Sequence, residues 1–227
     1  MRTLGAMCAG LCLAVLALSG CETAGHDQAD ATAADMDTLR GSLATLKEKS
    51  AAAAAAASNL IEKADSDPKT AYAAYQAEVK NYESARSSVT DKHKEMKSRE
   101  ADFFSSWEKQ SAAITEPDLK QKSIERRTKL QKTIESVDKS VEAVTGETTP
   151  FSATLSNLDK YWGMDLTSAG VTSAKDKVSD ASKSAKSIGK KCDDAIEAIE
   201  KAAPEFRTAK PPPPAPAKEG DKDKDKK

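Results

Sequence analysis

Apolar residues recur along most of this chain at alternating spacings of three and four residues. The pattern begins at Leu39 and returns, with short interruptions, as far as Ala202. Such spacing gathers the apolar residues into one stripe along a helix, and neighbouring helices of a coiled coil or bundle contact one another through stripes of this kind. The pattern therefore predicts an all-α protein built from long helices.

The first two helical segments have clear boundaries. The stripe of the first segment consists of Leu39, Leu43, Leu46, Ser50, Ala53, Ala57, Leu60 and Ala64. The sequence "DSDP" at 65–68 ends this helix, and we expect Asp67 to cap the next one with Pro68 as its first residue. The second segment runs without Gly or Pro from Lys69 to Glu116. A helix of this length extends for roughly 70 Å.

The remaining segments are predicted as three helices. The third helix has a stripe from Arg127 to Val144, and "GETTP" at 146–150 is expected to form a loop. A short amphipathic helix follows from Phe151 to Trp162, then a loop over 163–170 and a last helix from Val171 to Ala202. Single amphipathic helices are unstable in water, and short turns favour antiparallel neighbours. We expect an elongated antiparallel helical bundle or coiled coil over 35–203.

The two ends of the chain differ from the helical part. Residues 1–20 hold one early arginine, an apolar run and a small Ser-Gly pair before Cys21, which is the layout of a secretory signal peptide. The apolar run is shorter than the about 20 residues that cross a bilayer, so we expect it to be removed. The polar residues 21–34 predict a disordered tether. Prolines and alternating charges predict a disordered tail over 204–227.

The residues Leu18-Ser19-Gly20-Cys21 resemble the lipobox of bacterial lipoproteins. The resemblance implies that Cys21 carries membrane lipid such as palmitate, and two or more acyl chains make a stable anchor. Glu22 after the cysteine favours, by the same resemblance, an outer-membrane location facing the periplasm. The alternative is an ordinary signal peptide with a chance cysteine.

A second resemblance rests on "SREADFFSSWEKQ" at 98–110, followed by "LKQKSIERRTKLQKTIESVD" at 119–138. These stretches resemble a family of uncharacterised helical proteins of the bacterial envelope, known as a domain of unknown function. Phe103, Trp107 and Glu108 match the family's aromatic and Trp-Glu element. The resemblance implies an all-helical fold in an envelope setting, and it carries over no catalytic or binding residue.

Charge and composition exclude several functions. The chain carries 35 Lys and Arg against 36 Asp and Glu, which leaves no basic field for nucleic acid. It contains neither paired-His or Cys-x-x-Cys zinc spacing nor a Gly-rich phosphate loop or G-x-S-x-G elbow. We therefore expect no enzyme, cofactor or metal. Cys192, on the stripe of the last helix, is expected to be a buried small apolar residue.

Three polar residues interrupt the stripe of the second helix at intervals of seven: Arg86, His93 and Glu100. They form either a buried ionic layer that sets register or responds to pH, or a solvated stretch where this helix extends past its partners. We favour the solvated interpretation. Phe104 and Trp107 are candidate partner contacts, although the heptad spacing favours a core cluster with Phe103.

These expectations define a non-enzymatic, lipid-anchored envelope protein that acts as a helical spacer, scaffold or interaction module. Its partners would be membrane lipid, through Cys21, and another envelope protein or a second copy. One alternative is a periplasmic chaperone-like protein that holds apolar clients between its helices. Another is a lipoprotein linked to peptidoglycan through the C-terminal residue Lys227.

Overall fold

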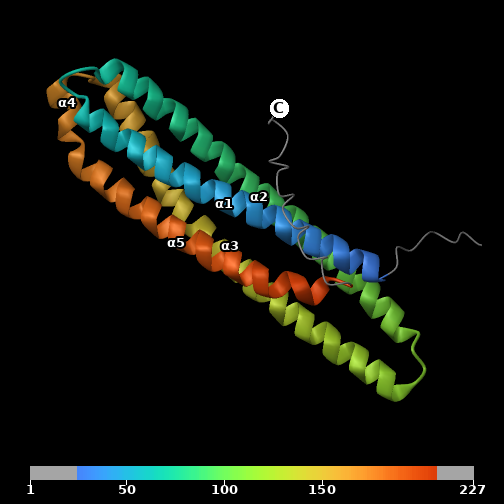
Figure 1. Ribbon diagram of the computed structural model, residues 1–227. Helices are drawn as coiled ribbons and strands as arrows, with labels where there is room; N and C mark the ends of the chain where they lie inside the picture. Colours follow the sequence, from blue (N-terminus) through green and yellow to red (C-terminus); the bar gives the residue numbers. More distant parts are fainter. Residues whose placement is uncertain (1–24, 209–227) are drawn as a thin grey trace, which may run out of the picture.

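The structure is a computed structural model that describes residues 25–208, and all regular secondary structure among them is helical. Its helices are α1 (Gly25–Glu62), α2 (Pro68–Ala112), α3 (Pro117–Met164), the short α4 (Ser168–Ser173) and α5 (Lys175–Phe206). The four long helices run antiparallel in chain order and form one elongated bundle (Figure 1). The 45 residues of α2 extend for about 68 Å. The expected all-α antiparallel bundle is confirmed.

The helices do not pack at equal distances. The backbone of α1 lies close to those of α2 and α5, whereas α2 and α3 approach each other at far fewer points. Small residues explain the close packing, because Ser50, Ala53 and Ala57 on α1 are fully buried. Large side chains explain the wide α2–α3 spacing, because that side of the core holds Tyr75 and Trp162, also fully buried. Residue size along each stripe thus sets the shape of the bundle.

The core runs along the length of the bundle and follows the predicted stripes. In α1 and the turn after it, all eight stripe residues from Leu39 to Ala64 are buried. In α5 the stripe from Val178 to Ala202 is buried as well. The Asp67 side chain caps α2 by accepting a hydrogen bond from the Thr70 N–H at 3.3 Å, and Pro68 is the first residue of α2. These local predictions are confirmed.

The loop predicted over 146–150 is wrong, because α3 continues through Pro150 to Met164. Pro150 lacks an N–H, so the carbonyl of Gly146 loses its helical partner. Both residues are exposed, so water can take the place of that bond. The stripe also keeps its rhythm here, since Val144, Thr148 and Phe151 are all buried. A proline on the solvated face of a well-packed helix therefore does not end it.

The predicted first and last residues of the helical part of the sequence need correction. Residues 25–34, expected in the tether, are helical, and Ala33 is 1% exposed. In the C-terminal part of the sequence, α5 passes Pro204 and ends at Phe206, which is buried against the core. The loop expected over 163–170 is partly helical, because α3 ends at Met164 and α4 starts at Ser168. The signal peptide and most of the expected tail lie outside the described residues.

No helix within residues 25–208 is both long enough and apolar enough to cross a membrane.

Candidate functional site at the α2–α3 interface

The stripe of α2 divides into two rows. One row is buried in the centre of the bundle: Tyr75, Tyr82, Val89, Met96 and Phe103. The other row is half-buried: Tyr72, Val79, Arg86, His93, Glu100 and Trp107. Members of the second row bond to α3 near both ends and in the middle of the interface. Polar side chains thus occupy the place where the α2 and α3 backbones lie far apart.

Two buried tyrosines of α2 reach the main chain of α3. The Tyr75 hydroxyl donates to the Leu155 carbonyl at 2.6 Å, and the Tyr82 hydroxyl donates to the Thr148 carbonyl at 3.0 Å. Burial raises the pKa of both hydroxyls. A buried phenol without a partner is costly, so each ring has one favourable position along α3. These bonds fix the register between α2 and α3.

Aromatic rings of α3 pack against the edges or faces of the same two tyrosines. The rings of Tyr75 and Trp162 lie 5.0 Å apart at 86°, and those of Tyr82 and Phe151 lie 5.0 Å apart at 82°. This T-shaped arrangement is favoured by the ring quadrupoles, at about 0.5–1.5 kcal/mol per pair beyond the apolar area buried. Each tyrosine therefore combines a fixed polar contact with a fixed aromatic one.

A polar group closes the interface near the α3–α4 turn. The Tyr72 hydroxyl donates to the Asp159 carboxylate at 2.9 Å, and the Gln76 amide donates to the same carboxylate oxygen at 3.0 Å. Burial, and then the hydrogen bond to Asp159, raise the pKa of Tyr72 to about 12. The group holds the first turns of α2 against the last turns of α3.

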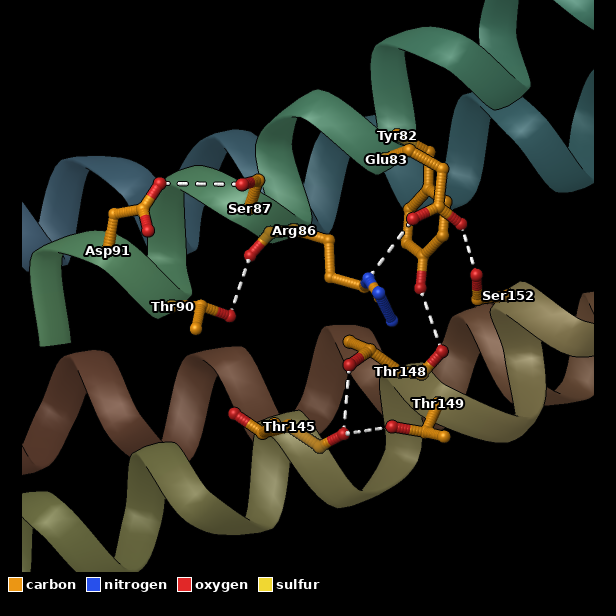
Figure 2. A network of polar contacts seen from close by, with 10 residues as sticks. All are labelled: Tyr82, Glu83, Arg86, Ser87, Thr90, Asp91, Thr145, Thr148, Thr149 and Ser152. Atoms are coloured by element: carbon orange, nitrogen blue, oxygen red, sulfur yellow. Dashed lines mark hydrogen bonds and ion pairs between the residues drawn. The ribbon is translucent and has the colours of Figure 1, made fainter. Parts of the chain in front are cut away.

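A second polar network surrounds Tyr82 (Figure 2). The Glu83 carboxylate accepts a hydrogen bond from the Ser152 hydroxyl and forms an ion pair with Arg86 Nε at 3.1 Å. On α3, the hydroxyls of Thr148 and Thr149 both donate to the Thr145 carbonyl, at 2.9 and 3.3 Å. Arg86 is half-buried. Its partner, the Glu83 carboxylate, also bonds to α3 and so links Arg86 to that helix.

An ionic group lies in the middle of the interface. His93 Nε2 is 2.7 Å from Asp138 Oδ1, and their side chains are only 13% and 14% exposed. Lys97 Nζ is 3.7 Å from the other Asp138 oxygen and 3.7 Å from the Glu142 carboxylate. The favoured interpretation of a solvated stretch is wrong for His93, because α3 supplies an acidic partner at the same level.

Glu100 lies next to this ionic group and is half-buried. Its pKa is raised to about 7, first by burial and then by the nearby Asp138 carboxylate, while Lys97 acts in the opposite direction. Its surroundings in the α2–α3 interface therefore favour the protonated, uncharged form of Glu100.

The aromatic element at the end of α2 forms part of the core. Phe103 contacts Phe104 at 5.0 Å, Trp107 at 5.4 Å and Phe206 of α5 at 5.9 Å, measured between ring centroids. The Trp107 indole N–H donates to the Ser123 hydroxyl at 2.8 Å. Phe104 is 7% exposed and has little surface left for a partner. Trp107 is half-buried and lines a cavity of about 570 Å³ with Leu130 and Phe206, among others.

The other predicted site residues divide into two groups. Cys21 and Lys227 lie outside the described residues. Cys192 is fully buried, and burial raises the pKa of its thiol to about 12, so it is unsuited to act as a nucleophile. Within residues 25–208, no group of three or more His, Cys, Asp or Glu side chains is arranged to hold a metal ion.

The sequence interpretation did not identify the partners on α3, chiefly Asp138, Asp159 and Ser123. Asp138 and Asp159 each follow a buried stripe residue, Val137 and Leu158. An acidic residue directly after a stripe position lies on the edge of the stripe, where a long polar side chain of a neighbouring helix can reach it. This position beside a stripe residue is the feature of the sequence that could have identified Asp138 and Asp159 as partners of α2.

The fold and the interface define an antiparallel four-helix bundle with a polar inter-helix contact region and no recognisable catalytic arrangement within the described residues. The chain belongs to the family described as "Protein of unknown function (DUF2959)", whose model matches residues 18–206. The resemblance to an uncharacterised helical family is thereby confirmed at the level of the family. Comparisons with curated proteins and with solved structures gave no match.

Replacing the two buried tyrosines tests their role in closing the interface. We expect Tyr75→Phe and Tyr82→Phe each to lower the free energy of unfolding by about 1 kcal/mol, the net value of a hydrogen bond, because each keeps the ring and loses the donor. Urea unfolding followed by circular dichroism measures the change. Tyr161→Phe is the matched control, since Tyr161 is 37% exposed and its hydroxyl bonds to the Ser173 side chain at the surface rather than across the α2–α3 interface. Equal effects of all three variants would contradict the role.

The raised pKa of Glu100 predicts that the stability of the protein depends on pH. The pKa of Glu100 is higher in the folded state than in the unfolded state. Its contribution to the free energy of unfolding is therefore fully present below about pH 4.5 and is lost as pH rises through about 7. We expect Glu100→Gln to be more stable than the parent protein at pH 8, with the difference shrinking as pH falls toward 5. Thermal melts across this range measure it, with Glu48→Gln on the exposed face of α1 as control. A difference that is constant with pH would contradict the assignment.

Proposed function

We propose that the protein is a non-enzymatic, lipid-anchored spacer or scaffold of the cell envelope. The observation that carries the proposal is the closed α2–α3 interface, bonded from Tyr72 at one end to Trp107 at the other. If the α2–α3 side of the bundle were loosely packed, the long helices would bend or separate along it. Bonds spread along that side support a stiff rod, which is what a spacer requires.

The proposed anchor would attach at one end of this rod. Cys21 precedes the first residue of α1, Gly25, by only four positions. Acyl chains on Cys21 would therefore hold the end of the bundle where α1 begins close to the membrane. The α3–α4 turn, at the opposite end, would then stand up to about 70 Å away. An outer-membrane location facing the periplasm rests on Glu22 after the lipobox cysteine.

The chaperone-like alternative requires the helices to separate and expose their stripes. Opening the α2–α3 side would expose the buried rings of Tyr75, Tyr82 and Trp162 and break the bonds of both tyrosine hydroxyls. This cost favours the spacer over the client-binding protein. Linkage to peptidoglycan through Lys227 stays a separate prediction that no described residue supports.

Cys21→Ser tests the anchor directly. We expect this variant to lose metabolic labelling with radioactive palmitate and to move from the membrane fraction to the soluble fraction, because serine lacks the thiol that receives the lipid. The measurement is autoradiography and immunoblotting of fractionated cells that express the full chain.

Cys192→Ser is the matched control for this test. Cys192 is fully buried in α5, so its substitution should leave both labelling and fractionation unchanged. Palmitate label retained on the Cys21→Ser variant would refute lipidation at Cys21 and, with it, the anchored-spacer proposal.

A further inference from the structure

One end of the bundle carries a projecting hairpin. α1 begins at Gly25, beside the Gln110 side chain of α2, and α5 ends near Arg126 of α3, which pairs with Glu205 at 3.0 Å. α2 and α3 continue past both of these ends and meet in a turn (Figure 1). Residues 111–123, which we call the hairpin tip, therefore extend beyond the start of α1.

The length of this projection follows from the helix geometry. The hydroxyls of Ser111 and Ser123 lie 2.6 Å apart, so these two residues face each other across the hairpin just past Gln110. α3 starts at Pro117, six residues before Ser123. At 1.5 Å per residue, the hairpin tip reaches about 9 Å beyond the start of α1.

The proposed anchor lies at this same end. Cys21 and Gly25 are separated by four residue steps, and four steps span at most about 14 Å whatever their conformation. A membrane that holds acyl chains on Cys21 is thus confined to about 14 Å from the start of α1. In a bundle that stands upright on the membrane, the hairpin tip fills most of that distance.

The surface of the hairpin tip suits the interfacial region of a bilayer. Leu119 is 57% exposed, and it is one of only four large apolar side chains exposed within residues 25–208. Lys120 and Lys122 are exposed beside it. Lysine stems lie along apolar surfaces while their ammonium groups stay among headgroups.

The charges of the hairpin tip argue for the bilayer interface rather than for a strongly charged partner. The tip holds two acidic residues, Glu116 and Asp118, and two basic residues, Lys120 and Lys122. With these charges balanced, apolar contact supplies the attraction.

We propose that the hairpin tip is a membrane-contact surface that rests on the bilayer holding the acyl chains of Cys21, with Leu119 entering the headgroup region. This inference rests on the proposed lipid anchor. An acyl anchor alone leaves the rod free to tilt about a single point. A second contact at the hairpin tip holds the rod upright and directs the α3–α4 turn away from the membrane.

A fluorophore placed at the hairpin tip tests this contact. The full-length lipidated protein, purified from membranes and placed in vesicles of phosphatidylethanolamine and phosphatidylglycerol, would carry an environment-sensitive label at Leu119→Cys in a Cys192→Ala background. Met164→Cys is the matched control, because Met164 is 80% exposed and lies at the opposite end of the bundle. We expect a blue shift and quenching by bromine-labelled lipid at position 119, and neither effect at position 164.

Four results would overturn the inference, and they differ in what else they affect. A label at 119 without a blue shift, or one shielded without lipid quenching, would show that the tip faces water or a protein while the anchor stays intact. Equal quenching at 119 and 164 would show a rod lying flat on the membrane. Protein that carries no lipid and does not float with vesicles would refute the proposed anchor itself, and the inference with it.

Discussion

The structure depends on how the wide gap between α2 and α3 is filled. Two phenol rings span it and deliver their hydroxyls to main-chain carbonyls of α3, at 2.6 Å from Tyr75 and 3.0 Å from Tyr82. A backbone carbonyl in a helix is already bonded once, and its second lone pair accepts the extra donor. The contact therefore leaves α3 intact, and it sets the register of the two helices without requiring any particular side chain at Leu155 or Thr148.

This arrangement explains why the bundle is lopsided and still closed. Alanine and serine on α1 bring its neighbours close, which leaves α3 at a distance that only large side chains can cover. The half-buried row of α2 then contains polar side chains that contact α3. His93 and Asp138 pair there at 2.7 Å, and Glu100 is held with a pKa near 7.

Most of the fold could be predicted from the sequence, because a stripe with spacings of three and four reports directly which residues face the core. The errors have definite physical causes. Pro150 was interpreted as part of a loop because its effect depends on whether its face is exposed, and the sequence shows this only through the unbroken rhythm of Val144, Thr148 and Phe151. His93 was assigned to solvent because its partner, Asp138, is 45 residues away in the chain. Helix boundaries at Gly25 and Phe206 depend on packing against other helices, which no local pattern encodes.

The central claim is that α2 and α3 form one closed, stiff unit in the protein with its proposed membrane anchor. Pulsed electron–electron double resonance measures the separation of two spin labels directly. The labels would be attached to cysteines that replace the exposed residues Asn81 of α2 and Ala153 of α3. The full-length lipidated protein in vesicles, with Cys192 replaced by alanine, should give a single narrow distance distribution. A second, longer distance in a substantial fraction of the molecules would show that the interface opens, and would contradict the rigid spacer.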